Sequence, residues 1–232
     1  MSERTFDEFD GFAENYRSIH TGNIKLSGAD SYYFAKMKVE YLKPFEKNET
    51  FSVLDVGCGD GATELFMNEL FPRWKVNAID VSVQSIEEAK KKNLPNVVFN
   101  SYDGLKIPFE NDSFDMVFIA GVLHHVEKKF HQMIIDEIKR VLKKNGRVYL
   151  FEHNPLNPFT RYLVNTCVFD KDAKLLKSNY TTGVLKESGL KITHKNFIIF
   201  FPRKGWLSKF ILLEKKLKWL PLGGQYFFRA FK

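Results

Sequence analysis

The sequence predicts an α/β protein in which helices cover both faces of a mainly parallel β-sheet. Short runs rich in Val, Ile and Phe alternate with segments of helical periodicity, which is typical of repeated β–α units. The central runs are almost continuously apolar, as strands are when both faces of their sheet are covered. The first run leads into a glycine-rich turn, VLDVGCGDGA at 53–62, of the kind that follows a strand at a nucleotide-cofactor site.

Periodicity and capping signals place the individual elements. Strands are expected at 51–56, 74–80, 96–101, 114–120, 147–153, 190–201 and 225–232. Helices are expected at 63–70, 82–93 with Ser82 as N-cap, 133–144 ending at Asn145-Gly146, 178–189 and 205–220. Residues 1–45 are expected to form two helices around the turn HTGN at 20–23.

Composition predicts an ordinary globular protein. The 232 residues are 44% hydrophobic and 27% charged, which favours a single domain with a full core. The N-terminal MSERTFDEFDGF is too polar for a signal peptide, and the apolar run at 197–201 is too short to span a membrane. We expect Cys58 and Cys167 to be free thiols, and the protein to be cytoplasmic.

The glycine-rich turn fits two cofactor fingerprints. Read from Gly57, it is G-x-G-x-x-A, which is typical of an NAD or FAD site. Read from Asp55, it is D-x-G-x-G-x-G, which indicates S-adenosylmethionine (SAM). Both cofactors need a turn without Cβ atoms after the strand, so the glycines alone leave the choice open.

Two carboxylates narrow that choice. Asp55 lies two residues before Gly57, where it would repel a pyrophosphate and attract the sulfonium and α-ammonium groups of SAM. Asp80 ends the second expected strand, where an acid suits the ribose hydroxyls of either cofactor. Asp80 therefore indicates an adenosine site, and Asp55 favours SAM.

Two further motifs complete a family resemblance. Asp103-Gly104 follows the third expected strand, and AGVLHH at 120–125 follows the fourth. Together with the acids and glycines above, they resemble the class I SAM-dependent methyltransferases, in particular the branch that acts on small molecules, over residues 50–153. The resemblance implies a Rossmann-like sheet of seven strands with the last strand antiparallel, helices on both faces and an N-terminal helical cap.

The same resemblance implies one methyltransferase domain over 1–232 and a set of cofactor contacts. A cap or lid at 1–45 would precede a SAM-binding core at 46–153, and 154–232 would hold an acceptor loop, a basic helix and the final strands. The residues expected at SAM are Asp55, Gly57, Gly59, Gly61, Asp80, Val81, Asp103, Gly104 and Ala120. Two alternatives stay open: Asp55 as a cap of the next helix, and Asp103-Gly104 as a plain turn.

Candidate catalytic residues lie at two neighbouring strand ends. His124 and His125 follow the fourth strand, and Glu152 and His153 end the fifth, so all four should border the cofactor crevice. A hydroxyl acceptor needs a general base, and a His-His pair with an acid after the next strand is similar to small-molecule and sugar O-methyltransferases. Each histidine has the alternative of a packing role, and Glu152 of only orienting a histidine. No tight carboxylate–histidine group with ligand spacing is visible, so we expect no metal.

The segment EHNPLNPFTRYLVNTCVFDKDAKLL at 152–176 is expected to form a loop and a helix at the mouth of the crevice. Its Asn157-Pro158-Phe159 differs in two ways from the N-P-P-F/Y motif of nucleic-acid methyltransferases. It lacks the second proline, and it follows the fifth expected strand instead of the fourth. The segment resembles methyltransferases of bacterial polysaccharide and lipid-linked sugar pathways, which implies a small or lipid-linked acceptor. Further acceptor or lid residues could be Arg161, Tyr162, Asn165, Tyr16, Tyr32 and Tyr33, the tyrosines having the alternative of a core role.

The net charge of +7 is concentrated in the C-terminal third. Lys and Arg number 20 against 24 Asp and Glu in residues 1–159, but 15 against 4 in residues 160–232. The expected helix at 205–220 combines lysines with an apolar stripe of Trp206, Phe210, Leu213, Leu217 and Leu220. It either packs on the sheet or contacts an anionic membrane at the inner face. No RNA-binding motif or stacking platform accompanies the charge, so nucleic acid is not expected. The oligomeric state stays open.

Overall fold

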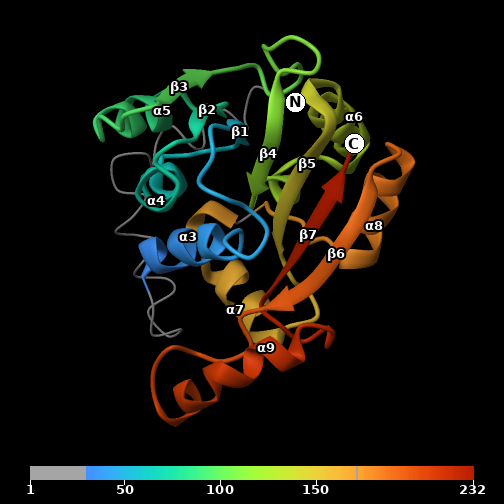
Figure 1. Cartoon of the computed structure of the whole chain (residues 1–232). Coiled ribbons are helices and arrows are strands. Elements are labelled where there is room, and N and C mark those ends of the chain that lie inside the picture. The colour runs from blue at the N-terminus through green and yellow to red at the C-terminus, as the bar shows by residue number, and fades with distance from the viewer. Residues whose placement is uncertain (1–29, 171) are drawn as a thin grey trace.

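The computed structural model describes residues 30–170 and 172–232, and its centre is a seven-stranded sheet in the order β3-β2-β1-β4-β5-β7-β6 (Figure 1). The strands are β1 (Ser52–Val56), β2 (Lys75–Asp80), β3 (Val97–Ser101), β4 (Phe114–Ala120), β5 (Leu142–His153), β6 (Lys191–Ile198) and β7 (Gln225–Phe231). The pairs from β3 to β5 are parallel, whereas β7 runs antiparallel to both β5 and β6. The predicted sheet with an antiparallel last strand is confirmed.

Helices and short 3-10 turns connect the strands. The α-helices are α3 (Ser31–Glu40), α4 (Ala62–Leu70), α5 (Val83–Lys90), α6 (Lys128–Val141), α7 (Pro158–Thr166), α8 (Ser178–Glu187) and α9 (Glu214–Leu217). The 3-10 turns are η2 (Leu123–His125), η3 (Val168–Asp170) and η4 (Trp206–Leu213). The predicted cap of α5 is confirmed, since the Ser82 hydroxyl accepts from Ser85 N at 3.0 Å. The predicted HTGN turn lies outside the described residues.

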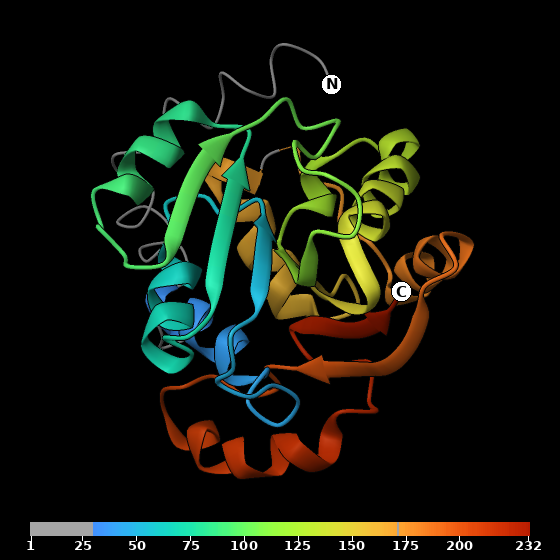
Figure 2. The same ribbon diagram turned by 45° about the horizontal axis from the view of Figure 1, so that its top comes forward.

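Both faces of the sheet are buried, as the continuous apolar runs predict. Along β4, Met116 and Phe118 pack into the cluster that contains α3 and α4 residues, whereas Val117 and Ile119 pack into the cluster that contains α6 and α8 residues. This alternation follows from the two-residue repeat of a strand. Figure 2 shows the same three-layer arrangement, with helices on both sides of the sheet.

The strand order fixes where a site can form. From β1 the chain moves outward through β2 to β3, and it then returns to add β4 on the other side of β1. In such sheets a crevice opens at the carboxyl ends of the strands where the order reverses. That edge carries the turn after β1, Asp80 at the end of β2, and the ends of β4 and β5.

Two predicted elements differ from the structure. Helix α6 ends at Val141, and 142–146 already belong to β5, so the prediction of a helix end at Asn145-Gly146 is wrong. Asn145 has a φ of +66°, and the pairing of β4 with β5 shifts register at this point. The Asn-Gly pair therefore forms an irregularity inside the strand, where its tolerance of positive φ is also used.

The predicted amphipathic helix at 205–220 is also wrong as a single α-helix. Residues 206–213 form a 3-10 turn, and only 214–217 are α-helical. The side chains of the predicted apolar stripe are not packed on the sheet over its first half, because Trp206 is 69% exposed and no residue of η4 is buried. Figures 1 and 2 show this segment along the outside of the molecule.

None of the helices in residues 30–170 and 172–232 is long and apolar enough to cross a membrane.

Candidate active site

The turn between β1 and α4 has the conformation that only glycine adopts readily. Gly57, Gly59 and Gly61 all have positive φ, at +81°, +54° and +77°. A Cβ on Gly57 would run into the Val122 side chain, and one on Gly61 would lie 2.9 Å from Phe99. A Cβ on Gly59 would meet nothing within 4 Å. Gly57 and Gly61 are therefore required for packing, whereas Gly59 faces open space at the strand edge.

Asp80 joins the turn after β1 to the start of α5. Its Oδ2 accepts from Gly59 N at 2.8 Å, and its Oδ1 accepts from Ser82 N at 2.9 Å. These bonds use one lone pair of each oxygen, so further acceptor capacity is left for ribose hydroxyls. Val81 follows in the same turn and is partly exposed. Asp80 thus positions the glycine turn as well as presenting a carboxylate at the edge.

Asp55 lies under the glycine turn beside a second acid, Glu64 of α4. Asp55 is 2% exposed and Glu64 is fully buried, and neither Glu64 oxygen meets a hydrogen-bond donor among the described residues. Burial raises the pKa of Asp55 to about 7, with Asp80 adding to the effect. Burial and the neighbouring Asp55 also raise the pKa of Glu64. Two carboxyl groups so placed retain protons to a higher pH than solvated acids do, and a bound cation would favour their ionised forms.

Asp103 occupies a surface turn after β3. Its Oδ1 accepts from Leu105 N at 2.8 Å and from Lys106 N at 2.9 Å, and these bonds lower its pKa. Gly104 is buried with a φ of +74°. This geometry agrees with the alternative that Asp103-Gly104 is a plain turn. A contact of Asp103 with adenine stays a prediction. Ala120, at the end of β4, is partly exposed beside the site.

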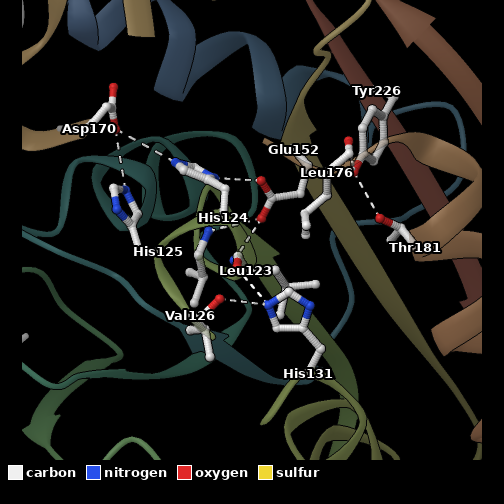
Figure 3. A network of polar contacts seen from close by, with 11 residues as sticks. Leu123, His124, His125, Val126, His131, Glu152, Asp170, Leu176, Thr181 and Tyr226 are labelled. Carbon is white, nitrogen blue, oxygen red and sulfur yellow. Dashed lines mark hydrogen bonds and ion pairs between the residues drawn. The ribbon is translucent and has the colours of Figure 1, made fainter. Parts of the chain in front are cut away.

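The ends of β4 and β5 are joined by one carboxylate (Figure 3). Glu152 Oε1 accepts from Val122 N at 3.1 Å and from Leu123 N at 2.8 Å, and its Oε2 lies 2.6 Å from His124 Nδ1. Glu152 and His124 are each 2% exposed. With three donors on a buried carboxylate, Glu152 orients His124 and the turn η2 rather than accepting a substrate proton.

The same turn is held from two further sides. His131 of α6 is fully buried, and its Nε2 lies 2.9 Å from both Leu123 O and Val126 O. Lys174 N donates to His124 O at 2.8 Å, which attaches the segment after η3 to the His-His turn. This attachment brings Asp170 to the site: its Oδ1 lies 3.4 Å from His125 Nε2 and 3.7 Å from His124 Nε2.

The charges of this cluster set the protonation of its histidines. Burial lowers the pKa of His124, but Glu152 and Asp170 outweigh this effect and raise it to about 9. Burial and the charge of His124 lower the pKa of His125 to about 3 and that of His153 to about 4. His124 therefore carries the proton near neutral pH, whereas His125 and His153 are neutral and have the form that a base needs.

His153 differs from the other two histidines of the cluster. It ends β5, its ring lies edge-to-face on that of His124 with centroids 5.1 Å apart, and it is partly exposed. Its main chain pairs with Gln225 of β7, whereas its imidazole makes no hydrogen bond to the residues that the structure describes. A neutral, partly exposed imidazole at this edge can accept a hydrogen bond from the hydroxyl group of an acceptor.

All four predicted catalytic residues thus come together, and Asp170 is the residue that sequence reasoning missed. It lies in the predicted acceptor loop, but nothing distinguishes it there from Asp172. A carboxylate–histidine group that was not visible in the sequence forms in the structure, because η3 brings Asp170 to the His-His pair, and the expectation of no metal stays a prediction. Asn157 caps α7 by accepting from Thr160 N at 2.8 Å, so the Asn-Pro-Phe sequence is a helix start. Arg161, Tyr162 and Asn165 are exposed on α7.

Comparisons with known proteins bear on the family and the fold. A family model described as a methyltransferase domain matches residues 53–146. The uncharacterized protein MJ0638 of Methanocaldococcus jannaschii is 29% identical over 86% of this chain and 81% of its own. The 27-O-demethylrifamycin SV methyltransferase of Amycolatopsis mediterranei is 31% identical over 42% of this chain, and the alignment spans only 37% of that enzyme.

Solved structures share the fold. A SAM-dependent methyltransferase from Archaeoglobus fulgidus superposes with a TM-score of 0.66 at 18% identity, covering 88% of this chain and 95% of the other. The structure of a complex between the Trm112 methyltransferase activator of Haloferax volcanii and its methyltransferase partner gives a TM-score of 0.70 at 17% identity, covering 96% of each chain.

The sheet, its strand order and the glycine turn define a Rossmann-like methyltransferase fold. Residues 53–146 form a methyltransferase domain, and the whole chain has the fold of the class I SAM-dependent methyltransferases, with SAM as the cofactor.

Proposed function

We propose that the protein transfers the methyl group of SAM to a hydroxyl oxygen of a small or lipid-linked, sugar-like acceptor. The observation that carries the proposal is the pair of neutral imidazoles, His125 and His153, at the same sheet edge as the glycine turn. Methyl transfer to oxygen requires removal of the hydroxyl proton, and a positioned base contributes roughly 10²–10⁴-fold. An amine that is already neutral would not need such a group.

The roles in the cluster divide between positioning and proton transfer. Glu152 and His124 are buried and bonded to each other at 2.6 Å, so they position the His-His turn. His153 is the first candidate for the base, and His125 is the second. Among the nine expected cofactor residues, Asp55, Gly57, Gly59 and Asp80 would hold SAM so that its methyl group faces these rings, since most of the catalysis is alignment of the acceptor.

The nature of the acceptor is supported by the sequence of 152–176 and by the surface around 205–222. The loop resembles those of enzymes of sugar pathways, and the A. mediterranei relative is named for an O-demethylated substrate. Lysines lie among exposed apolar side chains in the second segment, including Leu212 at 79% and Trp219 at 74% exposure. This combination suits an anionic, lipid-bearing acceptor or the membrane that contains it.

A second candidate is a methyltransferase-fold subunit that binds SAM and works with another protein. The H. volcanii neighbour, which was solved with an activator protein, supports it. The isolated chain separates the two candidates: incubated with labelled SAM and fractionated bacterial sugar and lipid extracts, it should yield a product heavier by one methylene. Release of S-adenosylhomocysteine together with that product supports the enzyme. SAM binding without product from any extract would favour the subunit.

A further inference from the structure

Asp170 is a charged residue of the histidine cluster that has no role in the proposed function. Its Oδ1 faces His125 Nε2 at 3.4 Å and His124 Nε2 at 3.7 Å, as Figure 3 shows. Both distances exceed the 2.7–3.2 Å of an N–H···O hydrogen bond. Asp170 pairs electrostatically with protonated His124, and loss of the Nε2 proton of His124 would leave three electron-pair donors around the gap between these side chains.

The size of this gap suits a metal ion. Zn²⁺ lies about 2.0–2.2 Å from His nitrogen and carboxylate oxygen, so two tetrahedral ligand atoms are about 3.4 Å apart. One ligand atom from each of His124, His125 and Asp170 fits within a span of 4.8 Å. A separation of up to 4.8 Å would have to close by as much as about 1.4 Å as the ion binds, which requires the partly exposed side chains of His125 and Asp170 to move.

Glu152 supplies a second, independent observation. Its Oε2 lies 2.6 Å from His124 Nδ1, so this nitrogen is the donor to the carboxylate and Nε2 is directed at the gap. Metal-binding histidines almost always have such a carboxylate or carbonyl partner on the other nitrogen, which fixes the ring and its tautomer. Glu152 is itself held by Val122 N and Leu123 N, so the ring of His124 is fixed before any ion arrives.

We propose that His124, His125 and Asp170 form a three-ligand site for a divalent transition-metal ion, with Glu152 orienting His124. Two imidazole nitrogens and one carboxylate oxygen suit Zn²⁺, Co²⁺ or Fe²⁺ and leave coordination positions open. An acceptor hydroxyl could fill one of them and lose its proton more easily, with His153 as the base because His125 is then a ligand. That role rests on the proposed function, whereas the site itself does not.

Co²⁺ binding to the untagged, full-length protein without acceptor tests the site alone. We expect one equivalent of Co²⁺ to bind with visible d–d absorption. Asp170→Asn and His125→Ala should each weaken binding at least about tenfold, and Glu152→Gln about 10–100-fold. His194→Ala, which removes a partly exposed histidine of β6 outside the cluster, is the matched control and should bind as the wild type does.

Asp170→Asn keeps the shape of the side chain but removes its charge beside His124, so a thermal unfolding scan of that variant must show a folded protein before its Co²⁺ affinity is compared. Zn²⁺ should displace Co²⁺ and remove the visible bands. Absence of saturable Co²⁺ binding, or equal affinity in wild type, Asp170→Asn and His125→Ala, would overturn the site. Methyl transfer to an extract component would be unaffected by that failure, so the two proposals fail separately.

Discussion

At the scale of single residues, the pair Asp55 and Glu64 links cofactor binding to protons. Both carboxyl groups are buried, and the described residues provide no donor for Glu64. The pKa of Asp55 is raised from 3.8 to about 7, so its proton stabilises the folded cofactor-free protein at low pH. That contribution is complete below about pH 4, the pKa in the unfolded chain, and is lost as pH rises towards 7. SAM, being a cation at this point, favours the ionised form.

The affinity for SAM should therefore fall as pH decreases from 8 to 6. One proton bound with a pKa of about 7 weakens binding about tenfold at pH 6, and isothermal titration in buffers of different ionisation enthalpy would count the proton released. Asp55→Asn should bind SAM weakly at every pH and lose the pH dependence. Glu49→Gln, at an exposed position before β1, is the control. An affinity independent of pH in the wild type would show that no proton is shared at this site.

The histidines show what residue types alone can and cannot predict. Strand ends are recognisable from apolar runs, so the meeting of His124, His125, Glu152 and His153 was predictable from the sequence. Which of them position the turn and which transfer a proton was not predictable, because these roles depend on which imidazole nitrogen contacts which carboxylate. Asp170 was out of reach for the same reason: its position depends on Lys174 N bonding to His124 O.

At the scale of elements, prediction succeeded where one periodicity decided the outcome. Strands β1, β2, β4 and β7 agree with their apolar runs within a few residues. It failed at 142–146, where positive φ at Asn145 serves a strand irregularity instead of a helix end. The Asn-Gly pair was correctly identified as tolerant of positive φ. Pairing of β5 with Phe114 and Met116 of β4 decides that this pair forms a strand irregularity and not a helix end.

The prediction of a single helix at 205–220 was wrong for a different reason. Its apolar spacing is helical, but Glu214 is needed elsewhere: its Oε1 accepts from Phe200 N and Phe201 N at 3.1 Å, and its Oε2 binds Arg203 at 3.2 Å. This buried acid fixes the backbone after β6 and interrupts the amphipathic pattern. The apolar side chains on either side of it are left exposed instead of forming a packed stripe.

At the scale of the whole molecule, charge and exposed apolar surface lie at the C-terminal third, away from the glycine turn. Exposed aromatic rings beside lysines are the combination that binds anionic lipid surfaces. The attraction is screened over about 8 Å at physiological ionic strength. We therefore expect the protein to sediment with vesicles that contain anionic lipid at low salt, and less so at high salt.

Replacing Lys215 and Lys216 with Gln should reduce sedimentation without changing the affinity for SAM. The matched control replaces Lys90 and Lys91 of α5, which are 52% and 67% exposed on another part of the surface. Equal binding of both double variants would assign the effect to net charge alone. If the wild type stays in the supernatant at low salt, the segment at 205–220 does not bind anionic lipid.

The central claim is that His153 removes the acceptor proton beside a SAM molecule held by β1 and β2. Turnover and SAM affinity of His153→Ala, measured together on the acceptor that the extract screen identifies, test it most directly. We predict that kcat falls about 10²–10⁴-fold while the dissociation constant for SAM stays within about twofold and Co²⁺ binding is unchanged, with His194→Ala behaving as the wild type. An unchanged kcat, or a parallel loss of SAM affinity and rate, would contradict the account.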